Sequence, residues 1–349
     1  MNDSINGKQN ILNLGPAELR GVVSAYGEKP FRADQVFGWL SKGVADFADM
    51  NNVPAALREK LAENYYIGQP EITDSRESKD GTVKCLFSFS DGAMVESVFM
   101  KYSYGNSICI SSQVGCRMGC TVCASTMDGL ERGLTGGEML GEVLAMRNHT
   151  GEDINHVVVM GMGEPFDNYD ELGRFIKLIH EPGGYNLSLR NITVSSCGII
   201  PGIRQFAGDF PQVNLAISLH APNQELREKT MPVAKKYEFN ELIQACKEYT
   251  DATGRRITFE YALIDGVNDS RQCAEELASH LKGMLAHVNL IPLNEVEGRE
   301  YRKARGENVL RFKEILEHKG IAATVRRTLG SDIDAACGQL RRRKSNNCD

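Results

Sequence analysis

Residues 105–125 read GNSICISSQVGCRMGCTVCAS, a short β-like run followed by three closely spaced cysteines. Cys116, Cys120 and Cys123 have a C-x3-C-x2-C spacing, which puts three thiols on one loop. A structural zinc site normally has four protein ligands, so three thiolates leave one coordination position open. An open position suits a catalytic iron-sulfur cluster. The spacing favours such a cluster, with an incomplete zinc site and a coincidence of buried cysteines as alternatives.

The run at 107–111 is the first of a series in which β-like runs alternate with helical stretches. The later runs lie at 154–160, 191–195, 213–219, 256–264, 288–293 and 323–328. This βαβ order predicts an α/β fold with a parallel sheet of six or seven strands and helices outside it. Nearly every run ends in polar or glycine-rich residues, and the carboxyl ends of parallel strands meet at one edge of a sheet. We therefore expect one pocket built from several distant segments.

Other parts of the chain have different patterns. Apolar residues at helical spacing in the first 65 residues predict short helices, and two-residue alternation over 71–100 predicts a β-hairpin. Asn168 and Glu171 have the spacing of a helix capping box. We predict four parts: a helical accessory domain (1–66), a β-hairpin bridge (67–105), the α/β core (106–340) and a basic tail (341–349).

Composition excludes disordered and fibrous proteins and indicates where the chain works. Of 349 residues, 42% are hydrophobic, but no run approaches the ~18 apolar residues of a membrane span, and the N-terminus has no signal-peptide pattern. We expect a cytoplasmic protein, whose ten cysteines serve metal ligation or thiol chemistry instead of a disulfide framework. The net charge of −6 argues against nucleic-acid binding by bulk charge. Residues 301–349 nevertheless carry 12 Lys/Arg against 6 Asp/Glu, a net +6, which leaves room for a local basic face.

Five motifs, in this order, resemble a known family. They are GNSICISSQVGCRMGCTVCAS (105–125), MGMGEPFDNYDE (160–171), ISLHAPN (217–223), HVNLIPLN (287–294) and DIDAACGQL (332–340). The chain resembles the RlmN family of radical S-adenosylmethionine (SAM) enzymes, which methylate carbon 2 of adenine in ribosomal and transfer RNA. The resemblance covers nearly the whole chain and implies a partial (β/α) barrel. It departs from the superfamily at Val122, where an aromatic residue is usual.

The resemblance implies two cofactors and the residues that bind them. Cys116, Cys120 and Cys123 would hold a 4Fe-4S cluster, and the open iron would bind the amino and carboxyl groups of SAM. The positions that match SAM contacts are Gly163, Glu164, Ser195, Ser218, Leu219, His220 and Asn294. Glycine allows close backbone approach, and the polar side chains can bind the ammonium and ribose of SAM. Taken singly, each of these residues is equally typical of a turn or a helix cap.

The resemblance also implies a mechanism. Carbon 2 of adenine is electron-poor, so a methyl cation cannot be transferred to it and a radical route is needed. One SAM would methylate Cys337, and the radical from a second SAM would take a hydrogen from that methyl group. The resulting carbon radical would add to the base. Cys109 would then resolve the protein-RNA adduct by forming a disulfide with Cys337, and Glu96 would accept the proton.

These three residues also have plainer interpretations. Cys109 is as consistent with a strand core as with a reactive site, whereas Cys337, flanked by Gly and Asp, is less typical of a core. Strand alternation predicts that Glu96 faces solvent. Three other cysteines fit apolar stripes and are predicted to be core, namely Cys85, Cys246 and Cys273. Neither Cys197, near the predicted pocket, nor Cys348, in the tail, is assigned a role.

The expected partners are ribosomal RNA of the large subunit, transfer RNA, and an electron donor resembling flavodoxin or ferredoxin. The protein is expected to be a monomer that does not bind membranes. RNA phosphates would meet basic clusters, and each cluster is equally typical of a solvated surface. These clusters are Arg255 with Arg256, Arg302 with Lys303, Arg326 with Arg327, and 341–344. Two other functions are considered: a carbon-8 adenine methyltransferase of the similar Cfr type, and a non-enzymatic, metal-stabilised RNA-binding protein.

Overall fold

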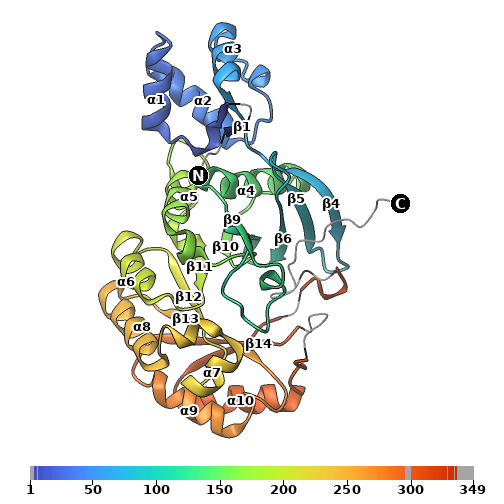
Figure 1. Cartoon of the computed structure of the whole chain (residues 1–349), viewed down its shortest axis with the longest axis vertical. Coiled ribbons are helices and arrows are strands. Elements are labelled where there is room, and N and C mark those ends of the chain that lie inside the picture. The colour runs from blue at the N-terminus through green and yellow to red at the C-terminus, as the bar shows by residue number, and fades with distance from the viewer. Residues whose placement is uncertain (1–3, 6, 295–299, 328, 334, 336–349) are drawn as a thin grey trace.

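The computed structural model describes residues 4–5, 7–294, 300–327, 329–333 and 335, with a ten-stranded sheet at its centre (Figure 1). The strand order is β15-β14-β13-β12-β11-β10-β7-β6-β5-β4. The first seven strands in this order pair in parallel. They are β7 (Gly105–Ile110), β10 (His156–Val159), β11 (Ile192–Ser196), β12 (Asn214–Ser218), β13 (Ile257–Leu263), β14 (Ala286–Pro292) and β15 (Ala322–Val325).

Helices connect the parallel strands and lie along one side of the curved sheet (Figure 1). They are α4 (Gly136–Thr150), α5 (Tyr169–His180), α6 (Ile200–Asp209), α7 (Gln224–Thr230), α8 (Phe239–Thr253), α9 (Arg271–Leu281) and α10 (Gly306–His318). Each parallel strand overlaps one predicted β-like run. The predicted α/β fold with six or seven parallel strands is therefore confirmed.

Local signals set the limits of α4, the helix that follows the cysteine loop. Thr135 caps its N-terminus by accepting a hydrogen bond from the backbone N–H of Glu138, and Glu138 completes a capping box. The helix ends at Gly151, which adopts a left-handed conformation with φ of 68°. The capping box predicted for α5 is wrong, because the Asn168 side chain caps nothing. Its amide donates instead to two backbone carbonyls, of Ser112 and Leu134.

The two faces of the parallel sheet differ sharply in polarity. Ile217, Phe259 and Val288 form one row across three adjacent strands, and all three are fully buried in the core. The next residue on each strand points to the opposite face. The row there consists of Ser218, Glu260, Asn289 and Thr324. The inner face of the curved sheet therefore carries polar side chains where the outer face carries apolar ones.

The N-terminal residues form helices α1 (Pro16–Ala25), α2 (Phe31–Ser41) and α3 (Ala55–Asn64) at one end of the molecule (Figure 1). They also form a small sheet of β1 (Ser4–Ile5), β2 (Lys8–Asn10) and β3 (Tyr65–Tyr66). This sheet was not predicted from the sequence, because strands of two or three residues are too short to show alternation. Short 3-10 turns at Ile11–Asn13 and Phe47–Asp49 complete this region.

The predicted hairpin is part of a three-stranded antiparallel extension of the main sheet. Its strands are β4 (Glu71–Glu77), β5 (Val83–Ser88) and β6 (Met94–Tyr102), and β6 pairs with β7. Because the sheet is continuous through residue 105, this extension and the parallel core share one layer. The boundaries predicted for the four parts remain predictions.

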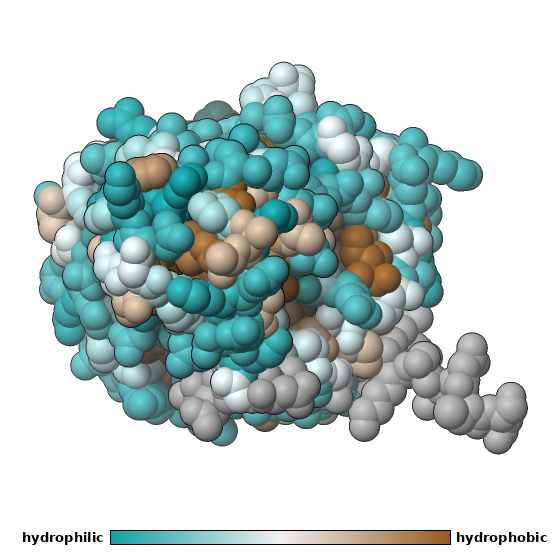
Figure 2. All heavy atoms as spheres, turned by 90° about the horizontal axis from the view of Figure 1, so that it is seen from above, coloured by the Kyte–Doolittle hydropathy of each residue, from teal (hydrophilic) through white to brown (hydrophobic). Residues whose placement is uncertain are grey.

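None of the helices within the described ranges combines the length and apolar character that crossing a bilayer requires. Figure 2 looks onto the end of the molecule that carries α1–α3. Hydrophilic residues cover most of this face, and hydrophobic residues appear there in small, separate areas.

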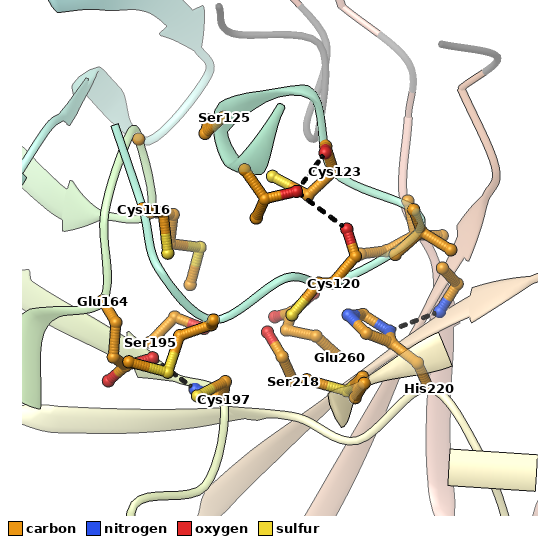
Figure 3. Close-up of a pocket in the computed structure, with 18 of the residues that line it drawn as sticks. Cys116, Cys120, Cys123, Ser125, Glu164, Ser195, Cys197, Ser218, His220 and Glu260 are labelled. Atoms are coloured by element: carbon orange, nitrogen blue, oxygen red, sulfur yellow. Dashed lines mark hydrogen bonds between the residues drawn. The ribbon is translucent and has the colours of Figure 1, made fainter. Parts of the chain in front are cut away.

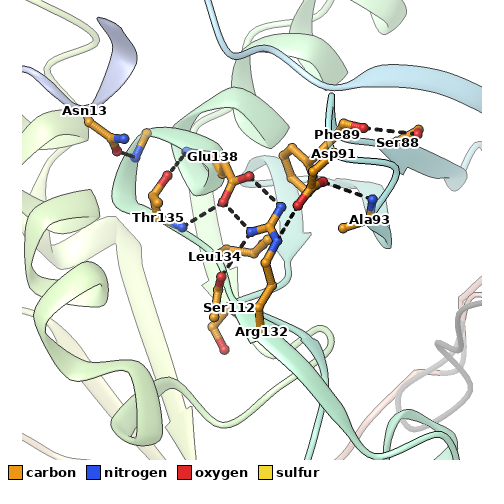
Figure 4. A network of polar contacts seen from close by, with 12 residues as sticks. Asn13, Ser88, Phe89, Asp91, Ala93, Ser112, Arg132, Leu134, Thr135 and Glu138 are labelled. Carbon is orange, nitrogen blue, oxygen red and sulfur yellow. Dashed lines mark hydrogen bonds and ion pairs between the residues drawn. The ribbon is translucent and has the colours of Figure 1, made fainter. Parts of the chain in front are cut away.

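A polar network joins the cysteine loop to α4 and to the β5–β6 turn (Figure 4). Arg132 lies on β9 (Leu130–Gly133), which pairs with β8 (Gln113–Gly115) across the loop. Its guanidinium makes two 2.8 Å hydrogen bonds to Glu138 and one of 2.7 Å to Asp91. Only 6% of the Glu138 side chain is exposed. The arginine partner offsets the free-energy cost of burying the charge of this carboxylate.

We expect Arg132→Met to lower the free energy of unfolding by about 3 kcal/mol, because it removes the charge and the two hydrogen bonds that Arg132 supplies to the buried Glu138 carboxylate. Arg204→Met is the matched control, since its pair with Glu248 is about half exposed and should contribute less than about 1 kcal/mol. Urea denaturation of both variants measures the difference. Equal losses would show that the network in Figure 4 contributes no more than a surface pair.

Candidate active site

Backbone contacts shape the loop that carries the three cysteines. The loop leaves β8 at Gly115, which has φ of +76°, and the Cys116 N–H donates to the Gly129 carbonyl across the loop. A Cβ at position 115 would lie 1.9 Å from the Gly129 carbonyl oxygen, so only glycine allows this closure. Within the loop, the Thr126 hydroxyl lies 3.1 Å from the carbonyls of both Cys120 and Cys123. Hydrogen bonds to the backbone of each cysteine therefore fix its position in the loop.

The loop is also tied to segments far away in the sequence. Arg117 forms an ion pair with Asp167, in the loop between β10 and α5. The backbone N–H of Thr121 donates to the carbonyl of Thr230, at the end of α7, over 2.9 Å. The loop is thus held at the carboxyl end of the sheet, where the predicted pocket lies.

The three thiols face one cavity and influence one another electrostatically (Figure 3). Burial raises the pKa of Cys116 to about 12, and the neighbouring Cys123 adds to the rise. Burial and both neighbouring thiols also raise the pKa of Cys120. Neutral thiols therefore predominate near pH 7 until a metal replaces their protons. Soft thiolate ligands of this kind suit an iron-sulfur cluster.

The number of thiols in the cavity disfavours a structural zinc site. Such a site normally takes four protein ligands, and the loop supplies three. A 4Fe-4S cluster held by three thiolates keeps one iron open for a further ligand. The three thiols that share this cavity therefore suit a cluster with an open iron.

The cavity has a volume of ≈ 1050 Å³, open solvent at its mouth included, which is ample for a cofactor of the size of SAM. Figure 3 shows the cysteine loop along one side and strand-end residues along the other. Six of the seven predicted SAM contacts line it, namely Gly163, Glu164, Ser195, Ser218, His220 and Asn294. Val122, the residue that departs from the superfamily pattern, also lines it and offers an aliphatic contact.

Leu219 is the exception among the predicted SAM contacts. Its side chain is fully buried in the hydrophobic core and does not line the cavity. Only its backbone faces the neighbouring strand, where its N–H donates to the Glu260 carbonyl over 3.0 Å. Any contribution of Leu219 to cofactor binding must therefore come from its backbone.

Glu164 is held rigidly at the end of β10. Its two carboxylate oxygens accept hydrogen bonds from different backbone N–H groups, Phe166 at 3.0 Å and Cys197 at 2.7 Å. Burial raises the pKa of the carboxyl group. Each oxygen retains a further lone pair. An ammonium group entering the cavity could therefore pair with Glu164 without breaking either bond.

His220 has an unusual backbone conformation, with φ of +54°. Its Nδ1 accepts a 2.9 Å hydrogen bond from the backbone N–H of Ala262, so the neutral ring carries its proton on Nε2. Burial, aided by the positive charge of Arg227, lowers the pKa of His220 to about 4. His220 is therefore a neutral hydrogen-bond donor at pH 7 and not a cation.

Sequence reasoning missed Glu260, although it lines the cavity beside Ser218. Its carboxylate accepts a 2.9 Å hydrogen bond from the Asn289 amide, and burial raises its pKa. The available signal was a single acidic residue inside the otherwise mainly apolar run 256–264. Arg326, predicted only as part of a basic cluster, lines the same cavity, and its positive charge partly opposes the rise in the pKa of Glu260.

Cys109 and Glu96 lie on the inner face of the sheet. Cys109 is 8% exposed and pairs with Val98, and Glu96 lies two residues before Val98 on the same face. On the other side of β7, Cys109 pairs with a residue of β10 that in turn pairs with Thr193 of β11. Thr193 lies two residues before Ser195. Glu96, Cys109 and the cavity residue Ser195 therefore share one face of the sheet.

The expectation that Glu96 faces solvent is wrong. Its side chain is only 8% exposed and forms a 3.2 Å ion pair with Lys84, whose side chain is 9% exposed. Alternation predicted that the Glu96 side chain points outward to solvent. The sheet is curved, however, and the side chains of β6 are buried on its inner face as well as on its outer face. Cys337, the proposed methyl carrier, lies outside the described residues, as do residues 341–344.

The core cysteines lie where the sequence placed them. Cys85 and Cys246 are fully buried in the hydrophobic core, and Cys273 is 7% exposed and belongs to the same core. Cys197 lines the cavity beside the cysteine loop and is buried. Cys109 also belongs to the hydrophobic core and does not line the cavity, although it lies on the same face of the sheet as Ser195.

Glu142 is a buried carboxyl group behind this face. It lies on α4, fully buried, and accepts hydrogen bonds from the Ser97 hydroxyl and, at 3.0 Å, from the Ser111 N–H. Its other oxygen has no partner. Burial raises the pKa of Glu142 to about 8, so the group is mostly protonated near pH 7.

We expect Glu142 to make the fold less stable as the pH rises. A folded-state pKa near 8, against 4.5 unfolded, means that the native state retains a proton that the unfolded state loses above about pH 4.5. Between pH 5 and 8, the free energy of unfolding of the wild type should fall by about 3 kcal/mol more than that of Glu142→Gln. Urea titrations of the apoprotein measure this, with the exposed Glu59→Gln as control. Parallel pH profiles for wild type and Glu142→Gln would contradict the prediction.

The fold and the cysteine loop define a radical SAM enzyme. A family model for the Radical SAM superfamily matches residues 110–277, and one for the ribosomal RNA large subunit methyltransferase N-terminal domain matches residues 9–67. A crystal structure of a radical SAM methyltransferase from Sphaerobacter thermophilus superposes with a TM-score of 0.92 and 44% identity, covering 95% of this chain and 99% of that one.

Two relatives described as "Probable dual-specificity RNA methyltransferase RlmN" are similar over nearly their full length. The one from Clostridium tetani is 51% identical, covering 96% of both chains, and the one from Alkaliphilus oremlandii is 51% identical, covering 97% of this chain and 99% of its own. The chain belongs to the RlmN family of dual-specificity RNA methyltransferases. It is an enzyme that uses SAM and a 4Fe-4S cluster, which excludes the non-enzymatic RNA-binding alternative.

Proposed function

We propose that this enzyme methylates carbon 2 of an adenosine in ribosomal RNA of the large subunit and in transfer RNA. The observation that carries the proposal is the shared face of Glu96, Cys109 and the cavity. A thiol and a paired carboxylate both lie on the inner face of the sheet, in the layer that leads into the cluster loop. A cofactor pocket alone would need neither group.

The cavity residues supply the binding of SAM. Cys116, Cys120 and Cys123 would hold the cluster, which, when bound, supplies one electron to SAM and so starts radical chemistry. Glu164, held by two backbone N–H groups, would receive the ammonium of SAM. Ser195, Ser218, His220 and Asn294 would bind its polar groups, and Gly163 would let the backbone approach.

Thiols and carboxylate would then handle the methyl group. Cys337, methylated by a first SAM, would carry the carbon to the base, leaving an adduct in which a sulfur-carbon bond joins protein to RNA. The adduct formed by radical addition would lose one electron to the oxidised cluster, and Glu96 would accept the proton from carbon 2, its ion pair with Lys84 holding the carboxylate in place. The Cys109 thiolate would then attack the Cys337 sulfur to form a disulfide. The sulfur-carbon bond would break with its electron pair moving onto the methylene carbon, which would take up a proton to become the methyl group.

The remaining partners follow from this chemistry. The RNA base must leave its stack to reach a cavity at the end of a barrel, as in other enzymes that modify bases. The cluster must be reduced before SAM can be cleaved, and we propose a donor resembling flavodoxin or ferredoxin. We propose that the enzyme acts as a monomer.

The position of methylation decides between this function and the carbon-8 alternative. We expect anaerobically reconstituted enzyme, given SAM, a reductant and unmodified ribosomal or transfer RNA, to produce 2-methyladenosine. Mass spectrometry of the digested RNA, with synthetic 2-methyl- and 8-methyladenosine as standards, measures the product. Exclusive formation of 8-methyladenosine would overturn the carbon-2 assignment and leave the cysteine chemistry intact.

A further inference from the structure

Arg227 is the largest fully buried side chain in the described part of the protein. It lies on α7, and its 0% exposure is exceptional, because an arginine is almost never fully buried without a partner. The Arg227 side chain does not line the cavity. A buried guanidinium retains its charge, since arginine is not deprotonated in proteins.

The hydrogen bonds of Arg227 do not account for its burial. One terminal nitrogen, Nη2, donates to the carbonyl of Cys197 over 2.5 Å. Nε and Nη1 are buried with no hydrogen-bond partner. Within the described ranges, no carboxylate lies at ion-pair distance from the guanidinium. Leaving such a charge uncompensated costs several kcal/mol, so a compensating group is expected nearby.

The groups that act on Arg227 are thiols. Burial lowers the pKa of Arg227, and the nearby thiols of Cys197, Cys120 and Cys246 partly oppose that shift. Burial likewise raises the pKa of Cys120 and of Cys197, and the charge of Arg227 partly opposes that rise. Cys120 is a ligand in the cluster loop. Thiols in their neutral form carry no charge, so they compensate Arg227 only when they are deprotonated.

The helix that carries Arg227 is fastened to the cluster loop. Thr230, three residues after Arg227, accepts a 2.9 Å hydrogen bond from the backbone N–H of Thr121, the residue after Cys120. Met231, the next residue, lines the cavity with the three cysteines. Arg227 is therefore held beside the cluster ligands by backbone contacts on the loop itself.

We propose that Arg227 is the buried counter-charge of the iron-sulfur cluster and that it makes the cluster easier to reduce. The proposal rests on the cluster site of the proposed function. Three bound thiolates make this end of the cavity negative, and each added electron makes it more so. A fixed positive charge in a dry environment favours the reduced form, because local charge and burial set the potential of iron-sulfur clusters.

This role makes an unusual prediction for the apoprotein. Without the cluster, the charge of Arg227 is uncompensated, so an apolar residue of similar length should be at least as stable. We therefore expect the apoprotein of Arg227→Met to match or exceed the wild type in free energy of unfolding. A purely structural role, through the bond to the Cys197 carbonyl, predicts a loss. A destabilised or unfolded Arg227→Met apoprotein would overturn the proposal.

The decisive measurement is the reduction of the cluster in reconstituted holoproteins. Anaerobic redox titrations followed by electron paramagnetic resonance give the ratio of reduced to oxidised cluster at a fixed solution potential. For Arg227→Met we expect this ratio to fall at least tenfold, equivalent to ~59 mV for one electron. Arg227→Lys, which keeps the charge, should restore most of the wild-type ratio.

Arg255→Met is the matched control. Arg255 also has a buried Nε without a partner and donates to Asn214, but it lies at the amino ends of the strands, away from the loop. Its replacement should leave the ratio unchanged. An unchanged ratio in Arg227→Met, with full iron loading, would overturn this proposal alone. Wild-type protein that binds no iron would instead overturn the cluster site on which the proposed function rests.

Discussion

Cys109→Ala should turn the enzyme into a trap that accumulates protein covalently joined to RNA. The methylated Cys337 could still be activated and add to the base, but no thiol would remain to break the resulting sulfur-carbon bond. Turnover should fall by more than about 10³-fold, since the missing group performs a bond-breaking step. Labelled RNA that comigrates with the protein on a denaturing gel, absent from the wild type, measures the adduct.

The control for this experiment is another buried cysteine of the same sheet. Cys85 lies on β5 and is fully buried, but it points to the opposite face from Glu96 and Cys109, because its neighbour Leu86 is the residue paired with Glu96. Cys85→Ala should lose stability by a cavity effect and give no adduct. Methylation by Cys109→Ala at the wild-type rate would show that a different group resolves the adduct. Such a result would remove the role of Cys109 without affecting the cluster.

Cys120→Ala should abolish SAM cleavage and RNA methylation together. Removing one of three thiolates leaves too few ligands for the cluster, so iron per chain should fall from about four to near zero after reconstitution. The fold should survive, because the Cys120 side chain is only half buried and the loop is held by backbone bonds. Iron analysis, deoxyadenosine release and circular dichroism measure the three effects.

Cys273→Ala is the control for cluster loss. Cys273 lies on α9, far along the chain from the loop, and its side chain packs in the hydrophobic core. This variant should retain iron and SAM cleavage. Stoichiometric zinc in place of iron in the wild type, unaffected by anaerobic reconstitution, would contradict the cluster assignment. Full iron loading of Cys120→Ala would contradict the ligand assignment alone.

The parts of the site that sequence could predict are those encoded locally. The spacing of three cysteines, the glycines around them and the runs that became strands are all properties of short segments. Sequence reasoning could not tell whether a face is covered, which is why Glu96 was expected to face solvent.

Glu260 and Arg227 could not be assigned from their neighbours in sequence. Glu260 acquires its setting from Asn289 and Ser218, on adjacent strands. Arg227 is buried because α7 docks on a loop about a hundred residues earlier, where the Thr121 N–H meets the Thr230 carbonyl. Leu219 shows the converse, since a residue inside a matching motif turned its side chain into the core.

The sequence by itself determined the family, the α/β order of the core and the residues able to ligate a cluster, because each depends on residue identity and on spacing within one segment. Only the tertiary structure decided which charges are buried, which are paired, and which lie beside the thiols. Burial and electrostatic pairing depend on segments brought together across the whole chain, and no local pattern records those distances.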